Sequence, residues 1–299
     1  ISENEFKKKL NYTYDSSAEF DRIPKIKKWD ESTLKNCKLL IVSEQGLGDT
    51  LQYMRYIYYI RQQKIEVLFC AQKKLHSLIK SSNITDNPLT PEQGGMVKEG
   101  KWLPLLSLPK YLGVTCQNPI FNSPYIFSTE KLIKKWEKIL STEKKPIIGI
   151  NWQGDPRMEK IHRGRSIPLE VFSKLHKQNK VSFLSLQKGF GSNQLNNCSF
   201  RENFVASQKA INNTWDFLNT SAIISNCDLI ITSDTAVAHL AGGMGKKVWL
   251  LLRYIPFWTW GMHSEKTVWY PSMRLFRQTE RDNWDEVMDR VSIELKKIF

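Results

Sequence analysis

Residues 230–242 read IITSDTAVAHLAG and carry the clearest structural signal in the chain. A short apolar run ends in Ser-Asp-Thr and passes at once into an alanine-rich segment, which predicts a buried strand followed directly by a helix. Ser233 or Asp234 is expected to cap this helix through a side-chain oxygen. The other N–H groups of the first turn, together with the positive end of the helix macrodipole, predict an anion-binding site.

Small residues and one histidine occupy the first turns of this helix. Ala236 and Ala238 leave room for a pyrophosphate to approach the backbone. His239 lies four residues after Thr235, so the two side chains share one face of the helix. A lone histidine is more often a satisfied core residue than a ligand contact, and both interpretations stay open for His239.

The alternation of strand and helix continues on both sides of this segment. Apolar runs predict strands over residues 39–42, 65–70, 147–151, 181–186, 229–232 and 248–252. Helical periodicity predicts helices that begin near residue 51 and that cover residues 73–80, 132–140, 169–177, 215–225, 235–242 and 284–295.

Repeated strand–helix units are typical of doubly wound α/β layers. We therefore predict an α/β fold with two Rossmann-like domains that face a cleft. The proline-containing stretch over residues 115–128 is the expected linker. It separates an N-terminal domain over residues 1–128, with a less regular lead-in over 1–35, from a C-terminal domain over 129–283 and a final helical segment over 284–299.

A glycine-containing loop, EQGLGDT at residues 44–50, follows the first predicted strand. Gly46 and Gly48 permit a tight turn and a close approach of the backbone to a ligand. Asp49 is expected at the helix start, where capping is the simplest interpretation of an aspartate. A dinucleotide fingerprint needs a third glycine where this chain has Leu51, and an acidic ribose ligand where it has Gln72 and a lysine, which disfavours an NAD-dependent enzyme.

A cationic loop follows the strand at residues 147–151. Arg157, Lys160, His162, Arg163 and Arg165 all fall within nine residues of one another. Guanidinium groups pair with phosphate oxygens in a bidentate manner, so this loop predicts a phosphate clamp, with a solvated basic loop as the alternative.

Composition limits the class of protein. The 299 residues include 44 Lys and Arg against 30 Asp and Glu, a net charge of +14, which keeps a nucleic-acid-binding role open although no helix-turn-helix, RNP or zinc-finger pattern is present. The five cysteines are scattered and form no C-x-x-C pair, which argues against a zinc site or a disulfide framework and fits a cytoplasmic protein. No integral membrane segment and no signal peptide are expected. The start at Ile1 is interpreted as that of a fragment.

Five stretches, in this order, resemble one family. They are EQGLGDTLQYMRYI (44–57), PLLSLPKYLGV (104–114), GINWQGDP with HRGRSIPLEVF (149–172), DTAVAHLAGGMGKKVWLLL (234–252) and WYPSMRLFRQ (269–278). They are similar to the glycosyltransferase domain that follows tetratricopeptide repeats in many bacterial proteins, a relative of the family 9 heptosyltransferases. The likeness runs from about Trp29 to the C-terminus. It implies a GT-B fold, an inverting mechanism, a nucleotide-sugar donor, no catalytic metal, no separate cofactor and an upstream repeat array.

The resemblance also assigns roles to residues. Asp49 matches a general base that would take the proton of the acceptor hydroxyl as its oxygen attacks the anomeric carbon. Helix dipoles and cations would stabilise the nucleoside diphosphate that leaves. Ala236 replaces the glycine usual in heptosyltransferases, which disfavours a heptose donor. The final helix is expected to cross back to the N-terminal domain. The expected donor-binding residues are Gly46, Gly48, Arg165, Gln187, Lys188, Asp234, Thr235, Ala236 and His239.

Two other functions stay open at this point. An inactive nucleotide-binding scaffold would bind the donor without turnover. A nucleic-acid-binding protein would bind with a steep salt dependence, although we expect no nucleic-acid partner. The sequence leaves the acceptor open among protein, lipid and glycan.

Overall fold

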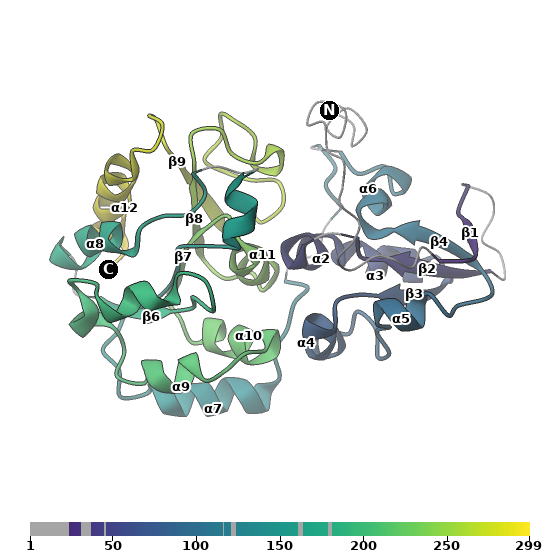
Figure 1. Ribbon diagram of the computed structural model, residues 1–299, viewed down its shortest axis with the longest axis horizontal. Helices are drawn as coiled ribbons and strands as arrows, with labels where there is room; N and C mark the ends of the chain where they lie inside the picture. Colours follow the sequence, from purple (N-terminus) through teal and green to yellow (C-terminus); the bar gives the residue numbers. More distant parts are fainter. Residues whose placement is uncertain are drawn as a thin grey trace.

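The chain folds into two α/β lobes, each built on a parallel sheet (Figure 1). The structure is a computed structural model and describes residues 24–30, 37–44, 46–115, 117–120, 124–160, 164–178 and 181–299. Both lobes are mixed α/β, so the expected fold class is confirmed.

The sheet of the first lobe has the strand order β1–β4–β2–β3. Its strand β2 is buried on both faces: Leu39 and Ile41 belong to one apolar cluster, Leu40 and Val42 to another. The elements of this lobe are β1 (Lys27–Lys28), β2 (Lys38–Val42), α2 (Leu47–Tyr53), α3 (Arg55–Gln62), β3 (Glu66–Cys70), α4 (His76–Ser81), α5 (Pro91–Gly94), β4 (Lys101–Pro104) and α6 (Leu108–Tyr111).

The sheet of the second lobe has the order β6–β5–β7–β8–β9, with every pair of neighbours parallel. Its apolar strands are buried on both faces by helices, as the continuous hydrophobic runs predict. The elements are α7 (Glu130–Leu140), β5 (Ile147–Asn151), α8 (Ser173–Gln178), β6 (Ser182–Ser185), α9 (Gln208–Asn212), α10 (Phe217–Ser225), β7 (Leu229–Ser233), α11 (Ala236–Gly243), β8 (Val248–Leu252), β9 (Met273–Arg277) and α12 (Trp284–Ile298).

Strand order reverses at one point in each sheet. β5 is followed in the chain by β6 on one side, whereas β7 lies on its other side, and β2 is flanked in the same way by β3 and β4. Ligands of open α/β sheets bind outside the carboxyl ends of the strands at such switch points. The loops after β2, β5 and β7 are therefore the places where the fold positions a site.

The two lobes share an apolar core and are in direct contact. One cluster of buried side chains includes residues of both sheets, and α2 of the first lobe packs against α11 of the second. The rings of Tyr53 and Trp269 lie 5.9 Å apart across this contact. Within the expected linker, the backbone N–H groups of Tyr125 and Ile126 donate to the carbonyl of Gly243, while Cys116 and residues 121–123 lie outside the described part.

The prediction that the final helix returns to the first lobe is wrong. α12 packs on α8 and β9 of the second lobe, on the side away from the first lobe (Figure 1). Its buried stripe, which includes Trp284, Val287 and Val291, joins a cluster that also holds Ile148 and Ile150 of β5. The helix thus covers one face of the second sheet with its apolar stripe.

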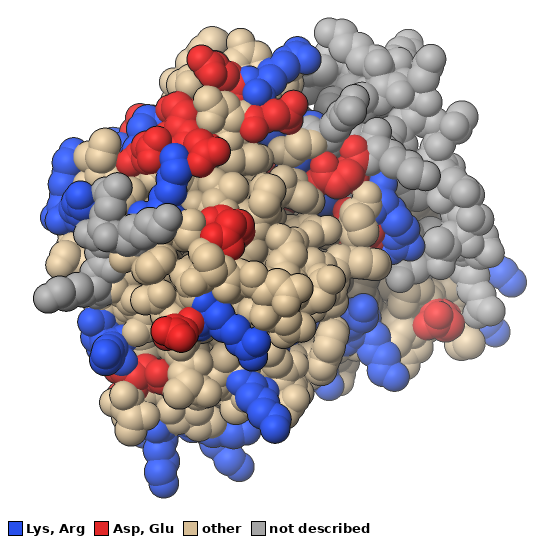
Figure 2. Space-filling model, turned by 60° about the vertical axis from the view of Figure 1, so that its left-hand side comes forward, with Lys and Arg blue, Asp and Glu red and all other residues tan. Residues whose placement is uncertain are grey.

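Three strands escaped sequence analysis. β4 lies beside β2, β1 lies beside β4, and β9 lies beside β8, but none of these short segments shows a continuous apolar run. No helix among the described residues is both long and apolar enough to cross a membrane. On the face shown in Figure 2, basic side chains are interspersed with acidic ones rather than gathered in one field.

Candidate functional site

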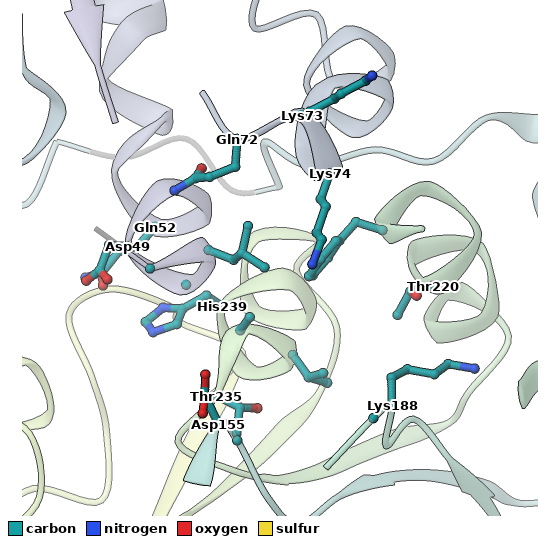
Figure 3. A pocket seen from close by; sticks show the side chains of 18 of the residues that line it. Asp49, Gln52, Gln72, Lys73, Lys74, Asp155, Lys188, Thr220, Thr235 and His239 are labelled. Carbon is teal, nitrogen blue, oxygen red and sulfur yellow. The ribbon is translucent and has the colours of Figure 1, made fainter. Parts of the chain in front are cut away.

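A cleft of about 1360 Å³ lies between the lobes, and it is lined by Asp49 and by all the expected donor-binding residues. The first lobe contributes the loop after β2 and the start of α2, and the second contributes the loops after β5, β6 and β7. Figure 3 shows Asp49 of α2 close above His239 of α11, with Thr235 and Asp155 further into the second lobe. Residues from four separate segments therefore meet in one cleft.

Gly46 and Gly48, in the loop after β2, have different structural roles. Gly46 is the N-cap of α2, and no side chain caps this helix. Gly48 lies at the contact between the lobes: a Cβ there would stand 2.9 Å from Cδ2 of His239 and 3.6 Å from Cα of Ala236. Only a residue without a side chain lets α2 approach α11 this closely.

Asp49 lies in the first turn of α2 and is partly buried in the cleft. Burial raises the pKa of its carboxyl from 3.8 to about 6, and the nearby charge of Asp234 adds to the rise. The backbone N–H of Gly46 and the charge of Arg165 act in the opposite direction. A carboxyl with this pKa is largely ionised at neutral pH and remains a competent base.

The start of α11 differs from the sequence prediction in one respect. Its N-cap is Thr235, and no side chain caps the helix, so the expected cap by Ser233 or Asp234 is wrong. The hydroxyl of Thr235 instead donates to Asn151 Oδ1 at 2.8 Å. The N–H groups of the first turn are thus left without a side-chain partner at the cleft, where an anion fits them.

Asn151, at the end of β5, forms hydrogen bonds that connect three loops. Its Oδ1 accepts hydrogen bonds from Thr235 and, at 3.3 Å, from Thr232, and its Nδ2 donates to Gln187 Oε1 at 2.8 Å. These bonds hold the loops after β5, β6 and β7 in fixed positions at the switch point.

Arg165 provides the central cation of the site. Burial raises the pKa values of Asp49 and Asp234, and the positive charge of Arg165 opposes this rise. The pKa of Asp155 is lowered mainly by a hydrogen bond from Arg157, with a smaller contribution from Arg165. Its buried Nε has no hydrogen-bond partner within the described chain. Gly154 makes room for it, because a Cβ there would lie 2.7 Å from an Arg165 terminal nitrogen. The basic residues at 161–163 lie outside the described residues.

Arg253, after β8, is a second cation of the cleft that sequence analysis missed. Burial lowers the pKa of Arg253, and Asp234 opposes this effect. Burial also raises the pKa of the Asp234 carboxyl, against the charges of Arg165 and Arg253. Arg165 and Arg253 therefore partly compensate the negative charge of Asp234 in the cleft.

Gln187 and Lys188 line the cleft, but their polar atoms are engaged within the protein. Gln187 Oε1 accepts three hydrogen bonds from the loop after β5, and its Nε2 donates to the carbonyls of Gln153 and Phe190. Gln187 thus holds the loops together, and its contact with a donor stays a prediction. Lys188 Nζ donates to the carbonyl of Ile211, and burial lowers its pKa to about 8.

The first lobe adds polar groups that no motif indicated. Gln52 follows Asp49 by one helical turn and lines the same cleft, and its buried Nε2 has no hydrogen-bond partner among the described residues. Gln72 lines the cleft from the end of β3, and its Oε1 accepts a hydrogen bond from Thr50 at 2.9 Å. Lys74 extends into the cleft in Figure 3. Sequence spacing is a signal for Gln52: residues three apart share a helix face, so Gln52 is expected beside Asp49.

Metal-ligating groups do not cluster in the described part of the chain: no set of three or more His, Cys, Asp or Glu side chains is close enough to hold an ion.

Comparison with known proteins gives a fold but no sequence family. No family model and no curated protein matches the chain. Among solved structures, the chain resembles a glycosyl transferase family 9 protein from Veillonella parvula, with a TM-score of 0.60, 11% identity and coverage of 90% of this chain and 91% of that one. It also resembles the ADP-heptose lps heptosyltransferase II of E. coli (TM-score 0.53, 9% identity, 87% and 99% covered).

A third similar structure is TibC, an iron-containing dodecameric glycosyltransferase from enterotoxigenic E. coli, with a TM-score of 0.50, 12% identity, and coverage of 91% of this chain and 76% of that one. At such low identity the likeness concerns the fold. The chain has the two-lobed GT-B architecture that the sequence predicts.

Proposed function

We propose that this protein is a metal-independent, inverting glycosyltransferase that moves a sugar from a nucleotide-sugar donor to an acceptor hydroxyl. One observation carries the proposal. A partly buried carboxyl on one lobe, Asp49, faces an uncapped helix N-terminus and the cation of Arg165 on the other. Transfer of a sugar between two bound substrates requires a base for the acceptor and an anion site for the donor, and here they lie on opposite walls of one cleft.

The second lobe is the proposed donor site. The first turn of α11 offers N–H donors and the positive end of a helix dipole to a diphosphate. Arg165 and Arg253 add two positive charges that stabilise the negative charge developing on the departing nucleoside diphosphate. The unpartnered Nε of Arg165 supports this role, because a buried charged donor without an acceptor is costly unless a ligand supplies one.

The first lobe is the proposed acceptor site, and Asp49 is its base. The carboxylate takes the proton of the acceptor hydroxyl while the hydroxyl oxygen forms a bond to the anomeric carbon. The bond between that carbon and the phosphate oxygen breaks, and the electron pair leaves with the nucleoside diphosphate. A single displacement of this kind inverts the configuration at the anomeric carbon. The structural neighbours include a heptosyltransferase with an ADP-heptose donor, which makes ADP-sugars the first donors to test.

A thermal-shift panel of ADP, GDP, UDP and CDP and their sugar conjugates tests the donor site, because a ligand that binds only the folded state raises the melting temperature. We expect one nucleotide series to stabilise the wild type and to have little effect on Arg165→Ala. Lys98→Ala, which removes an exposed cation outside the cleft residues, is the matched control and should respond like the wild type.

Transfer itself is tested with the donor so identified, by release of the nucleoside diphosphate in the presence of candidate acceptors. We expect release to require Asp49. Binding without release, unchanged by Asp49→Asn, would reduce the protein to a nucleotide-binding scaffold. Stabilisation by DNA or RNA but by no nucleotide would overturn the proposal in favour of nucleic-acid binding.

A further inference from the structure

A buried cation lies at the contact between the lobes, outside the catalytic groups. Arg55 of α3 is 2% exposed. Its guanidinium donates to the carbonyls of Gln52 and Trp269, both at 2.8 Å, and to the hydroxyl of Tyr125 at 3.0 Å. The rings of Tyr125 and Tyr270 lie 4.5 and 4.7 Å from its charge centre. Among the described residues no carboxylate forms an ion pair with it, so tyrosine rings and carbonyls hold this charge.

Tyr270 connects this cation to the donor side of the cleft. Its hydroxyl lies 2.9 Å from Nδ1 of His239, and both side chains are buried. Arg55 and Tyr125 also hydrogen-bond to this hydroxyl. The positive charge of Arg55 attracts the hydroxyl oxygen, so the hydroxyl hydrogen points away from Arg55. The neighbouring hydroxyl of Tyr125 already donates to the carbonyl of Leu51 at 2.8 Å. When the hydroxyl of Tyr270 donates to Nδ1, the ring hydrogen of His239 is on Nε2.

The Nε2 edge of the ring lies at the contact between the lobes. His239 lines the cleft, and its Cδ2 and Nε2 lie at the backbone of Gly48. Stacking on Trp260, with ring centroids 5.3 Å apart, fixes the ring plane. Burial, aided by the charge of Arg55, lowers the pKa of His239 to about 3, so the ring is neutral at physiological pH. A neutral imidazole binds a phosphate oxygen only through its N–H, which makes the tautomer decisive.

We propose that Arg55 and Tyr270 are positioning residues that hold His239 in the tautomer whose Nε2–H donates to an oxygen of the bound nucleoside diphosphate. This inference rests on the function proposed above. Arg55 lies on the first lobe, whereas Tyr270 and His239 lie on the second. The hydrogen-bonding state of the donor site thus depends on a side chain from the opposite lobe.

Two substitutions of His239 test which of its two ring nitrogens donates to the nucleotide. The amide nitrogen of glutamine occupies the place of Nε2, and that of asparagine the place of Nδ1. We expect His239→Gln to keep most of the affinity for the nucleoside diphosphate that best stabilises the wild type, and His239→Asn to lose at least tenfold. Equal loss in both variants would overturn the assignment of the donor to Nε2.

Tyr270→Phe tests the positioning role, because it keeps the ring and removes the hydroxyl. We expect at least a tenfold loss of affinity, and long-range ¹⁵N–¹H NMR should show His239 as the Nε2–H tautomer in the wild type and as a mixture in the variant. Tyr56→Phe is the matched control. It removes a neighbouring hydroxyl that, within the described part of the chain, donates to the carbonyl of Pro119 at 3.1 Å, and it should leave affinity and tautomer unchanged.

The failures of the two proposals can be told apart. A wild type that binds nucleotide, with Tyr270→Phe binding equally well and showing the same tautomer, would overturn the positioning role and leave the proposed function standing. A wild type that binds none of the four nucleoside diphosphates would overturn both.

Discussion

Asp49→Asn is expected to stabilise the protein at neutral pH while it removes the proposed base. Burial raises the pKa of this carboxyl from 3.8 to about 6. A difference of about 2 pKa units corresponds to about 3 kcal/mol of unfavourable free energy for holding the ionised carboxylate in the fold. Because water in the cleft screens a partly exposed group, we expect about 1–3 kcal/mol.

The stability difference between wild type and variant depends on pH. Below pH 3.8 the carboxyl is protonated in both the folded and the unfolded chain, and wild type and variant are equally stable. As the pH rises from 3.8 toward 6, the unfolded chain releases the proton and the folded chain keeps it, so the wild type loses stability. Above about pH 6 the loss is complete, and the advantage of the variant is constant.

Thermal unfolding of both proteins at pH 4 and pH 8 is the assay. For a chain of 299 residues about 1 kcal/mol shifts the melting temperature by about 1.5 °C, so the variant should gain about 2–5 °C at pH 8 and little at pH 4. Asp155→Asn is the control with the opposite sign: a hydrogen bond from Arg157 lowers the pKa of Asp155, and its loss should destabilise the protein at pH 8. An Asp49→Asn variant no more stable than the wild type at pH 8 would refute the reasoning.

Three further predictions concern the site and the core. The transfer rate should fall about tenfold per pH unit below pH 6, as Asp49 becomes protonated, and should level off above it; a flat profile from pH 5 to pH 8 would contradict Asp49 as the base. Gly48→Ala should destabilise the protein by about 1–3 kcal/mol in urea unfolding, because its Cβ would stand 2.9 Å from His239, and should also weaken nucleotide binding. Trp284→Ala should cost about 3–5 kcal/mol of stability yet leave the nucleotide-induced thermal shift intact, since Trp284 is buried in the second lobe away from the cleft.

Local patterns predicted much of the fold. The apolar runs at β2, β5, β7 and β8 and the helical stripe of α12 are properties of consecutive residues, and burial on two faces or on one follows directly from them. β1, β4 and β9 were missed because their pairing is decided by the strands beside them. The packing of α12 was wrong for a related reason: its stripe indicates that the helix is buried, but not which lobe covers it.

For the candidate site too, some features follow from the sequence and others only from the tertiary structure. The chain by itself determined that Asp49, Arg165 and the segment from Asp234 to His239 follow strand ends, and parallel strands bring their carboxyl ends to one edge.

Only the tertiary structure decided what each of these groups does. It left the first turn of α11 without a side-chain cap, engaged the amide of Gln187 within the loops and joined Arg55 to His239 through Tyr270. These outcomes depend on pairs of residues from distant segments and from both lobes. Hydrogen-bond partners, burial and the resulting pKa shifts exist only once such segments meet in space, so no pattern along the chain encodes them.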